Sequence, residues 1–253
     1  MRALRVVGLV AAIALATSLP AAAGGFPRFG AGCTRDDVAV AGRTVRAELC
    51  RAAAPASRAV VVLHGCGGFS TFDHRIVTSL PKDGISTLDV DYFALTPPPG
   101  GKGFCNAGAS VGSAFPLWVR TVAAAAAKLR ATPGISARGV GVVGWSLGGG
   151  LAVAAAEELS QPRAFDAIAA FSTGSFGAEA EAAKLPATIL LSAGRTDAIP
   201  LAETLPLYRA LRAAGVPSSL FVYANGSHAW PGAQGTAGIA RAAAFLRRYL
   251  RPR

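Results

Sequence analysis

A chain of 253 residues, 52% hydrophobic and 15% charged, has the size of one large domain and is too apolar for wholesale disorder. Its formal net charge of +11 would attract nucleic acid or anionic surfaces if it were concentrated in one patch. The basic residues are scattered instead, and no run interleaves them with aromatic residues, so we expect a solvated basic surface and no nucleic-acid partner.

Residues 1–23 have the pattern of a cleaved signal peptide. A positive start with Arg2 and Arg5 precedes an uncharged apolar run at residues 6–16, and three alanines then supply a cleavage site before Gly24. The alternative is an uncleaved anchor, but the run is shorter than the ~20 residues that cross a bilayer. We therefore expect an exported protein, periplasmic or secreted, without stable membrane insertion after cleavage.

The four cysteines, Cys33, Cys50, Cys66 and Cys105, fit an oxidising compartment. No Cys-x-x-Cys or Cys/His spacing suggests zinc, and we expect no metal. We favour the pairs Cys33–Cys50 and Cys66–Cys105, because each joins segments that are near in sequence. The alternative is that at least one pair is reduced and buried.

Short apolar strands alternate with longer helical stretches along residues 24–253, which we expect to form a single domain. Strands are predicted at residues 45–49, 59–63, 85–92, 139–144, 167–171, 187–193 and 219–223. Helices are predicted at residues 72–80 (closed by Pro81), 118–130, 147–159, 201–214 and 238–250. This β-then-α spacing predicts an α/β fold, with a parallel sheet covered by helices on both faces. Reactive residues then collect at the carboxyl ends of the strands.

The strongest chemical signal is Gly-Trp-Ser-Leu-Gly at residues 144–148. It fits Gly-x-Ser-x-Gly, the strand-to-helix turn that raises a nucleophilic serine, here Ser146, above the sheet of α/β hydrolases. The alternative is a glycine-rich packing turn with an idle serine. The preceding residues 139–144 also match Gly-x-Gly-x-x-Gly, but that fingerprint must follow a strand, whereas here it forms the strand. We therefore expect no dinucleotide and no other cofactor.

A serine hydroxyl needs a base, and in this fold the chain order is serine, acid, histidine. His228 is the only histidine after Ser146 and follows the last predicted strand. Asp197 follows the strand at 187–193, whereas Asp166 precedes a strand and so lies at the wrong end. The alternative role for Asp197 is to cap the helix that begins near Pro200.

The oxyanion formed in acyl transfer needs backbone donors at the elbow and at an earlier strand end. The predicted donors are the Leu147 N–H and the Cys66 N–H, the latter in the loop His-Gly-Cys-Gly-Gly at residues 64–68. The alternative for Cys66 is a reactive thiol. His64 precedes the oxyanion position and is expected to pack or cap the loop, and His74 to lie on a helix surface.

Together these blocks resemble the dienelactone hydrolase family of α/β hydrolases. The resemblance runs from the His-Gly-Cys-Gly-Gly loop through the serine motif and Gly-Arg-Thr-Asp to Gly-Ser-His-Ala-Trp. It implies an eight-stranded, mostly parallel sheet and a triad of Ser146, Asp197 and His228. The family's namesakes carry a cysteine nucleophile and a glutamate beside the oxyanion loop, where this chain has Ser146 and Gly65.

Ordinary carboxylic ester hydrolysis is therefore the expected reaction, rather than lactone chemistry. We expect an exported serine hydrolase that cleaves a small-molecule ester through a Ser146 acyl-enzyme. A peptidase or thioesterase with the same triad is the alternative within this class. A non-catalytic envelope protein that binds a ligand with this scaffold is the alternative from another class.

Overall fold

The computed structural model describes residues 32–53, 57–96, 111–159, 164–174, 182–185, 188–224 and 226–250. The predicted signal segment at residues 1–23 and Cys105 lie outside these ranges. Within them, no helix is both long enough and apolar enough to span a bilayer.

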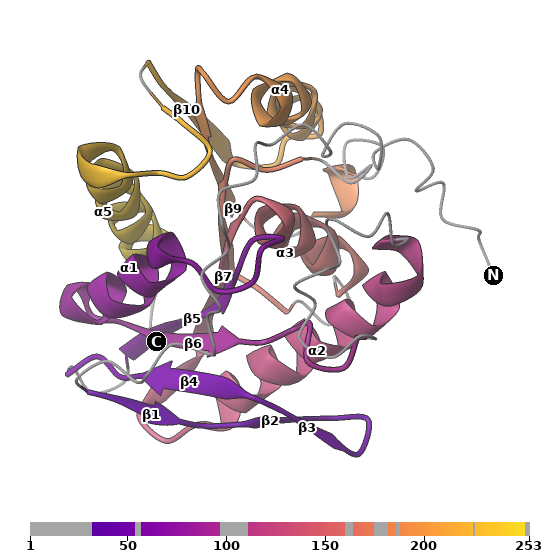
Figure 1. Ribbon diagram of the computed structural model, residues 1–253, viewed down its shortest axis with the longest axis vertical. Helices are drawn as coiled ribbons and strands as arrows, with labels where there is room; N and C mark the ends of the chain where they lie inside the picture. Colours follow the sequence, from indigo (N-terminus) through magenta and orange to yellow (C-terminus); the bar gives the residue numbers. More distant parts are fainter. Residues whose placement is uncertain are drawn as a thin grey trace.

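An eight-stranded sheet runs through the molecule in the order β1-β4-β6-β5-β7-β8-β9-β10 (Figure 1). Neighbours from β6 to β10 are parallel, whereas β4 is antiparallel to both β1 and β6. This confirms the predicted mostly parallel sheet of eight strands. The strands are β1 (Cys33–Arg35), β4 (Ala47–Cys50), β5 (Ser57–Leu63), β6 (Ile85–Val90), β7 (Ile135–Trp145), β8 (Ala167–Phe171), β9 (Thr188–Gly194) and β10 (Ser218–Tyr223).

A separate hairpin pairs β2 (Val38–Val40) with β3 (Arg43–Val45). The single strand predicted at residues 45–49 is thus divided in two. Val45 ends the hairpin, and Ala47 begins a strand of the main sheet. The apolar pattern runs through both pieces because the inward-facing residues of each are buried.

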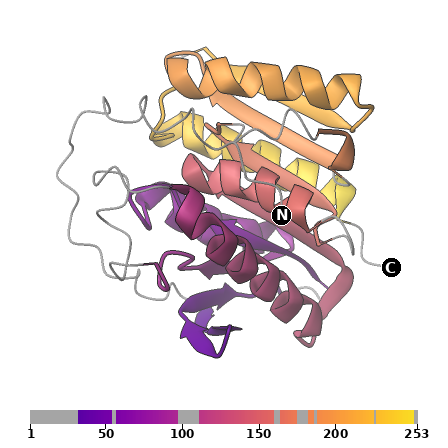
Figure 2. The ribbon, with the colours of Figure 1, turned by 90° about the vertical axis from the view of Figure 1, so that its right-hand side faces the viewer.

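Helices cover both faces of the sheet, as predicted. They are α1 (Thr71–Ser79), α2 (Val111–Ala131), α3 (Leu147–Glu158), α4 (Ala198–Ala213) and α5 (Gly232–Tyr249). Figure 1 shows α1 and α5 on one side of the sheet, and Figure 2 shows α2, α3 and α4 side by side on the other. In β5, Val60 and Val62 pack toward α1 and α5, while Val61 and Leu63 pack toward the other face. All four are fully buried, which explains the unbroken apolar run of this strand.

The first helical segment continues past its predicted end. α1 ends at Ser79, but the 3-10 turn η2 (Leu80–Asp83) follows at once and contains Pro81 near its start. Proline suits the first positions of a helical turn, because its fixed φ is helical and an N–H there has no intrahelical partner. Pro81 therefore opens a new turn instead of closing the helix.

Three other helices, α2, α4 and α5, begin at least three residues earlier than predicted. α2 begins at Val111 and contains Pro116, and α5 begins at Gly232. Proline and glycine have the lowest helix propensities, so the sequence pattern shows no sign of these first turns. In α5 the packing explains the glycines, because a Cβ on Gly235 would overlap the Trp230 carbonyl oxygen and a Cβ on Gly238 would lie 2.7 Å from the Trp230 ring. The fit of the helix against that ring outweighs local propensity.

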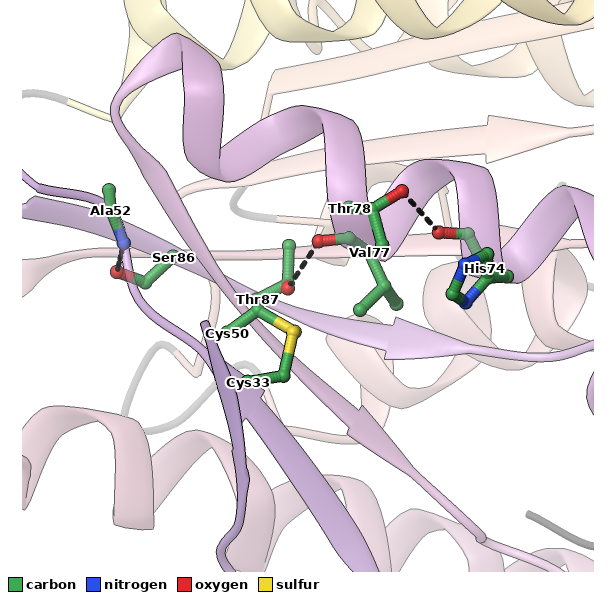
Figure 3. Close-up of a disulfide and its surroundings, with 8 residues drawn as sticks. All are labelled: Cys33, Cys50, Ala52, His74, Val77, Thr78, Ser86 and Thr87. Atoms are coloured by element: carbon green, nitrogen blue, oxygen red, sulfur yellow. Dashed lines mark hydrogen bonds between the residues drawn. A yellow bond between two sulfur atoms is a disulfide. The ribbon is translucent and has the colours of Figure 1, made fainter. Parts of the chain in front are cut away.

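The predicted disulfide between Cys33 and Cys50 is present (Figure 3). The two residues are cross-strand partners in the antiparallel pair β1–β4, which places their Cα atoms 4.1 Å apart. Figure 3 also shows how the next strand, β6, is tied to α1, through the Thr87 hydroxyl that donates to the Val77 carbonyl at 3.1 Å. The disulfide therefore links the outermost strand, β1, to β4, and the next strand, β6, is hydrogen-bonded to α1.

Carboxyl groups are buried in the core next to this region. Asp89 on β6 is the cross-strand partner of Glu48 on β4, and both are at most 3% exposed. Burial raises the pKa of Asp89 well above its ordinary value, and the negative charges of Asp73, Glu48 and Asp91 raise it further. Among the described residues, Asp89 Oδ1 has no hydrogen-bond partner. A protonated, neutral side chain is the form that suits this site.

Asp73, near the start of α1, is the second buried acid with a raised pKa. It forms a capping box with Ser70, whose N–H and hydroxyl both donate to Asp73 Oδ2, at 2.8 Å and 2.6 Å. Burial nevertheless raises the pKa of Asp73 to about 6, because the loss of hydration outweighs these hydrogen bonds.

We expect the free energy of unfolding to fall as the pH rises from about 4 to above 6. A carboxyl with a raised folded-state pKa stabilises the fold fully below its unfolded pKa, near 4, and this contribution is lost as the pH passes the folded value. For Asp73 the loss is on the order of 3 kcal/mol. Thermal unfolding measured between about pH 4 and pH 9 checks the trend.

The matched variant is Asp89→Asn, which keeps the shape and removes one ionisable group. Its melting temperature should depend less on pH than that of the parent chain. Asp83→Asn, at a partly exposed carboxyl, should keep the parent's pH profile. Identical profiles for Asp89→Asn and the parent would contradict the prediction.

Candidate active site

Ser146 lies in a tight turn between β7 and α3. Its backbone has φ 55° and ψ −121°, a conformation that is rare for a residue with a side chain. The flanking glycines leave room for this turn. A Cβ on Gly144 would overlap the backbone of Gly148. A Cβ on Gly148 would overlap the carbonyl groups of Leu63 and His64. The Gly-x-Ser-x-Gly spacing therefore reflects steric requirements on both sides of the serine.

Three side chains from separate loops form a hydrogen-bonded chain at the carboxyl ends of the strands. His228 Nε2 lies 3.0 Å from Ser146 Oγ, and His228 Nδ1 lies 2.9 Å and 3.1 Å from the two carboxylate oxygens of Asp197. An ionised carboxylate can only accept, so Nδ1 carries the proton and Nε2 faces the serine hydroxyl as acceptor. Asp197 is buried, whereas the His228 side chain is 44% exposed. The three residues that chain order selected thus meet in space.

Asp197 occupies the N-cap position of α4, but its side chain forms no capping hydrogen bond. The carboxylate turns to His228 instead, so the geometry does not match the alternative in which it caps the helix. Asp166 directly precedes β8 and lies at the other end of the sheet. At the carboxyl end of β8, Ser172 offers only a hydroxyl, which accepts a hydrogen bond from Trp230 Nε1 at 2.9 Å.

The loops that carry Asp197 and His228 are hydrogen-bonded to each other. The Thr196 N–H and hydroxyl both donate to the carbonyl of Gly226. A Cβ on Gly194 would overlap the Gly226 backbone, so the two loops are in close contact. Gln234 in α5 accepts from the Ser227 N–H at 3.0 Å and donates to the Ser227 carbonyl at 3.1 Å. The position of the histidine loop therefore depends both on the loop after β9 and on the start of α5.

His64 supports the loop that follows β5. Its ring is fully buried and stacks on Tyr92 at a centroid distance of 4.2 Å, and its Nδ1 lies 2.8 Å from the Gly65 carbonyl. The Tyr92 hydroxyl donates to the His64 carbonyl at 2.8 Å. His64 thus packs beneath the loop, while His74 is exposed on α1.

The two predicted oxyanion donors lie on adjoining segments. Leu147 is the first residue of α3, where N–H groups have no intrahelical partner. Cys66 is in the loop after β5, and α3 abuts this strand end through Gly148. Cys66 is disulfide-bonded and so does not present the free thiol that its alternative role requires. Cys105, its predicted partner, lies outside the described residues.

Sequence reasoning missed the residues that hold the histidine loop from outside. Trp145 Nε1 donates to the His228 carbonyl at 2.8 Å. Arg75 on α1 donates to the carbonyls of Trp230 and Gly232, at 3.2 Å and 2.9 Å. Trp230 is fully buried and has a positive φ of 50°. The spacing of these residues along the chain carries no sign of these contacts, since the pairings join residues that are 83, 155 and 157 positions apart and depend on tertiary packing.

Among the described residues, one group of His, Cys, Asp and Glu side chains has donor atoms close enough to share a metal ion. It consists of Cys33, Glu48 and Cys50. The two sulfurs are bonded to each other, so they are not available as thiolate ligands.

A family model for the dienelactone hydrolase family matches residues 45–247, which is most of the chain and includes the whole Ser146, Asp197 and His228 constellation. The chain belongs to the dienelactone hydrolase family. It is a dienelactone hydrolase-like α/β hydrolase, as its motifs predicted. No curated protein matches the chain significantly.

Solved structures with the same fold include other members of this family and enzymes named as esterases. A dienelactone hydrolase from Anabaena variabilis is 22% identical, with a TM-score of 0.73 over 87% of this chain and 100% of that chain. A fungal esterase from Rhizomucor miehei is 17% identical, with a TM-score of 0.70 over 86% and 83%. The metagenomic carboxylesterase EstE1 is 18% identical, with a TM-score of 0.66 over 87% and 90%. At these identities the likeness shows the shared fold.

Proposed function

We propose that this family member is an exported serine hydrolase that cleaves carboxylic esters of small molecules through a Ser146 acyl-enzyme. The observation that carries the proposal is the unbroken hydrogen-bonded chain from Ser146 through His228 to Asp197, at a strained strand-to-helix turn. Membership of a hydrolase family and fold neighbours named as esterases support it.

The geometry fits a two-step acyl transfer. The Ser146 oxygen attacks the ester carbonyl while His228 Nε2 takes its proton, and Asp197 stabilises the resulting imidazolium. The same proton then passes to the departing alkoxide, which leaves as an alcohol. A water then attacks the acyl-enzyme while His228 Nε2 takes its proton and passes it to the Ser146 oxygen, which releases the carboxylic acid and restores the serine. The Leu147 and Cys66 amides are the proposed donors to the oxyanion in both steps.

Rival functions are separated by the choice of substrate. The same triad would cleave amides and thioesters, whereas a ligand-binding member of the fold would cleave none of these. Purified protein is assayed against matched p-nitrophenyl esters, p-nitroanilides and thioesters, together with labelling by a fluorophosphonate probe. We expect ester turnover to dominate. Absence of both turnover and labelling would favour the binding protein.

Ser146→Ala should abolish fluorophosphonate labelling and lower ester turnover by several orders of magnitude. The fold should persist, since the substitution removes only a hydroxyl, and circular dichroism checks this. Ser219→Ala, on the exposed side of β10, is the control and should label like the parent. If the Ser146→Ala protein still labels, another residue is the nucleophile.

Asp197→Asn should lower kcat by roughly 10³- to 10⁴-fold at neutral pH with little change in melting temperature. The amide keeps the shape of the side chain but favours the wrong imidazole tautomer, leaving Nε2 protonated and unable to accept from Ser146. Asp166→Asn, at the opposite end of β8, should keep the parent's kcat. A destabilised but active Asp197→Asn enzyme would remove this residue from the mechanism.

Export is part of the proposal and rests on the pattern of residues 1–23. The chain also has four cysteines, enough for two disulfides, and disulfides are typical of proteins outside the reducing cytosol. When the full chain is expressed in a bacterial host, the periplasmic or secreted fraction should contain a form that begins at Gly24 or within a few residues of it. Intact-mass measurement decides the matter, and soluble cytoplasmic protein that retains Met1 and the whole segment would refute export.

A further inference from the structure

The side chain of Trp145 joins the segments on which the proposed mechanism depends. Trp145 is the last residue of β7 and is bonded directly to Ser146. Its indole N–H reaches across to the carbonyl of His228, at a Nε1–O distance of 2.8 Å. The indole and imidazole ring centroids are 5.5 Å apart. One side chain thus bridges the nucleophile and the base.

This contact closes a ring of covalent bonds and hydrogen bonds around the reacting atoms. The ring runs from Ser146 through the Trp145 backbone and indole to the His228 carbonyl, then through the imidazole back to Ser146 Oγ. Asp197 fixes the far nitrogen of the imidazole ring, but a ring can still shift with its backbone. The indole hydrogen bond holds that backbone at a set distance from the nucleophile.

The same indole also contacts the loop that carries the proposed oxyanion donor. A Cβ on Gly65 would lie 2.6 Å from two carbon atoms of the Trp145 six-membered ring. Phe72 on α1 meets the indole edge to face, at a centroid distance of 6.2 Å. The ring is therefore held between the loop after β5 and the first turn of α1. The absence of a side chain at residue 65 is what lets the indole lie where it can reach His228.

We propose that Trp145 is a positioning residue, which sets the distance from His228 to Ser146 through its hydrogen bond to the His228 carbonyl and is itself placed by contact with Gly65. This inference rests on the proposed function. Trp145 occupies the first x position of Gly-x-Ser-x-Gly, where the motif specifies no residue type, and Gly65 lies outside the triad. The proposal gives each of them a role in positioning the base.

The chain offers a matched comparison, because each of its three tryptophans donates its indole N–H. Trp118 Nε1 donates to Thr96 Oγ1 at 2.8 Å, and its fully buried ring packs against the rings of Tyr92 and Phe93. A tryptophan whose role is only structural should behave like Trp118. A positioning residue should affect turnover beyond any effect on stability.

The first test replaces each ring by one without the donor. Trp145→Phe should lower kcat by roughly 10- to 100-fold with KM nearly unchanged, and slow fluorophosphonate labelling to a similar extent, because a displacement of about 1 Å has such effects. Trp118→Phe should lower the melting temperature but leave kcat within about twofold. If the two variants lose turnover equally, or Trp145→Phe keeps the parent's kcat, the proposal is wrong.

The second test moves the indole without changing it. Gly65→Ala should reproduce the loss of kcat seen in Trp145→Phe, and the double variant should lose less than the product of the two single losses. Gly67→Ala is the loop control, because a Cβ there meets nothing within 4 Å, and its loss should be markedly smaller. Equal losses at the two glycines would mean that the loop, and not the indole, is sensitive.

A third readout does not depend on activity. Hydrogen–deuterium exchange of the backbone amides at residues 226–230 should be faster in Trp145→Phe than in the parent chain and in Trp118→Phe. Unchanged exchange would overturn the positioning role even in an active enzyme. If the parent neither hydrolyses esters nor labels, the proposed function fails, while the exchange measurement still decides whether Trp145 holds the histidine loop.

Discussion

The close approach of α3 to the end of β5 is the constraint on which the site depends. Gly148 lies against the carbonyl groups of Leu63 and His64 with no space for a side chain. That contact brings the first amide of α3 beside the loop that holds Cys66, and it fixes the direction in which the turn presents Ser146. The strained backbone of the serine follows from it, because a relaxed turn would carry the helix away from the strand. Nucleophile and proposed oxyanion donors are therefore placed by one packing contact.

Features that depend on neighbours in sequence could be predicted, and features that depend on distant contacts could not. The elbow is local, since the two glycines and the serine lie within five residues of each other and the steric need for them is the same wherever the turn occurs. The parallel sheet likewise follows from alternating segments. Asp197 and His228 could be chosen because chain order in this fold restricts the candidates to strand ends, and few acids or histidines were available there.

The contacts that position those residues join segments that are distant in sequence, so they could not be predicted. Nothing near Trp145 indicates that its indole meets a carbonyl 83 residues later, and nothing near Arg75 points to Trp230. The early start of α5 was missed for the same reason. Gly235 is unfavourable for a helix on a propensity scale, but a Cβ there would overlap the carbonyl oxygen of Trp230. Side-chain packing between segments decided each of these cases, and a single sequence carries no record of it.

The disulfide at the end of the sheet has a consequence for solubility. A three-residue edge strand such as β1 forms few hydrogen bonds with its neighbour. If β1 detached, the exposed N–H and C=O groups of β4 could pair with a strand of another chain. The bond from Cys33 to Cys50 closes a loop with a sequence separation of 17, which is worth about 3 kcal/mol in chain entropy and prevents β1 from slipping or detaching. At the opposite edge, Arg241 lies over the exposed ring of Phe221, 3.8 Å from its centroid. The β1 edge is thus held by a covalent bond, whereas at the β10 edge a guanidinium lies over an aromatic ring. Resistance to aggregation at the β1 edge therefore depends on the redox state of the surroundings.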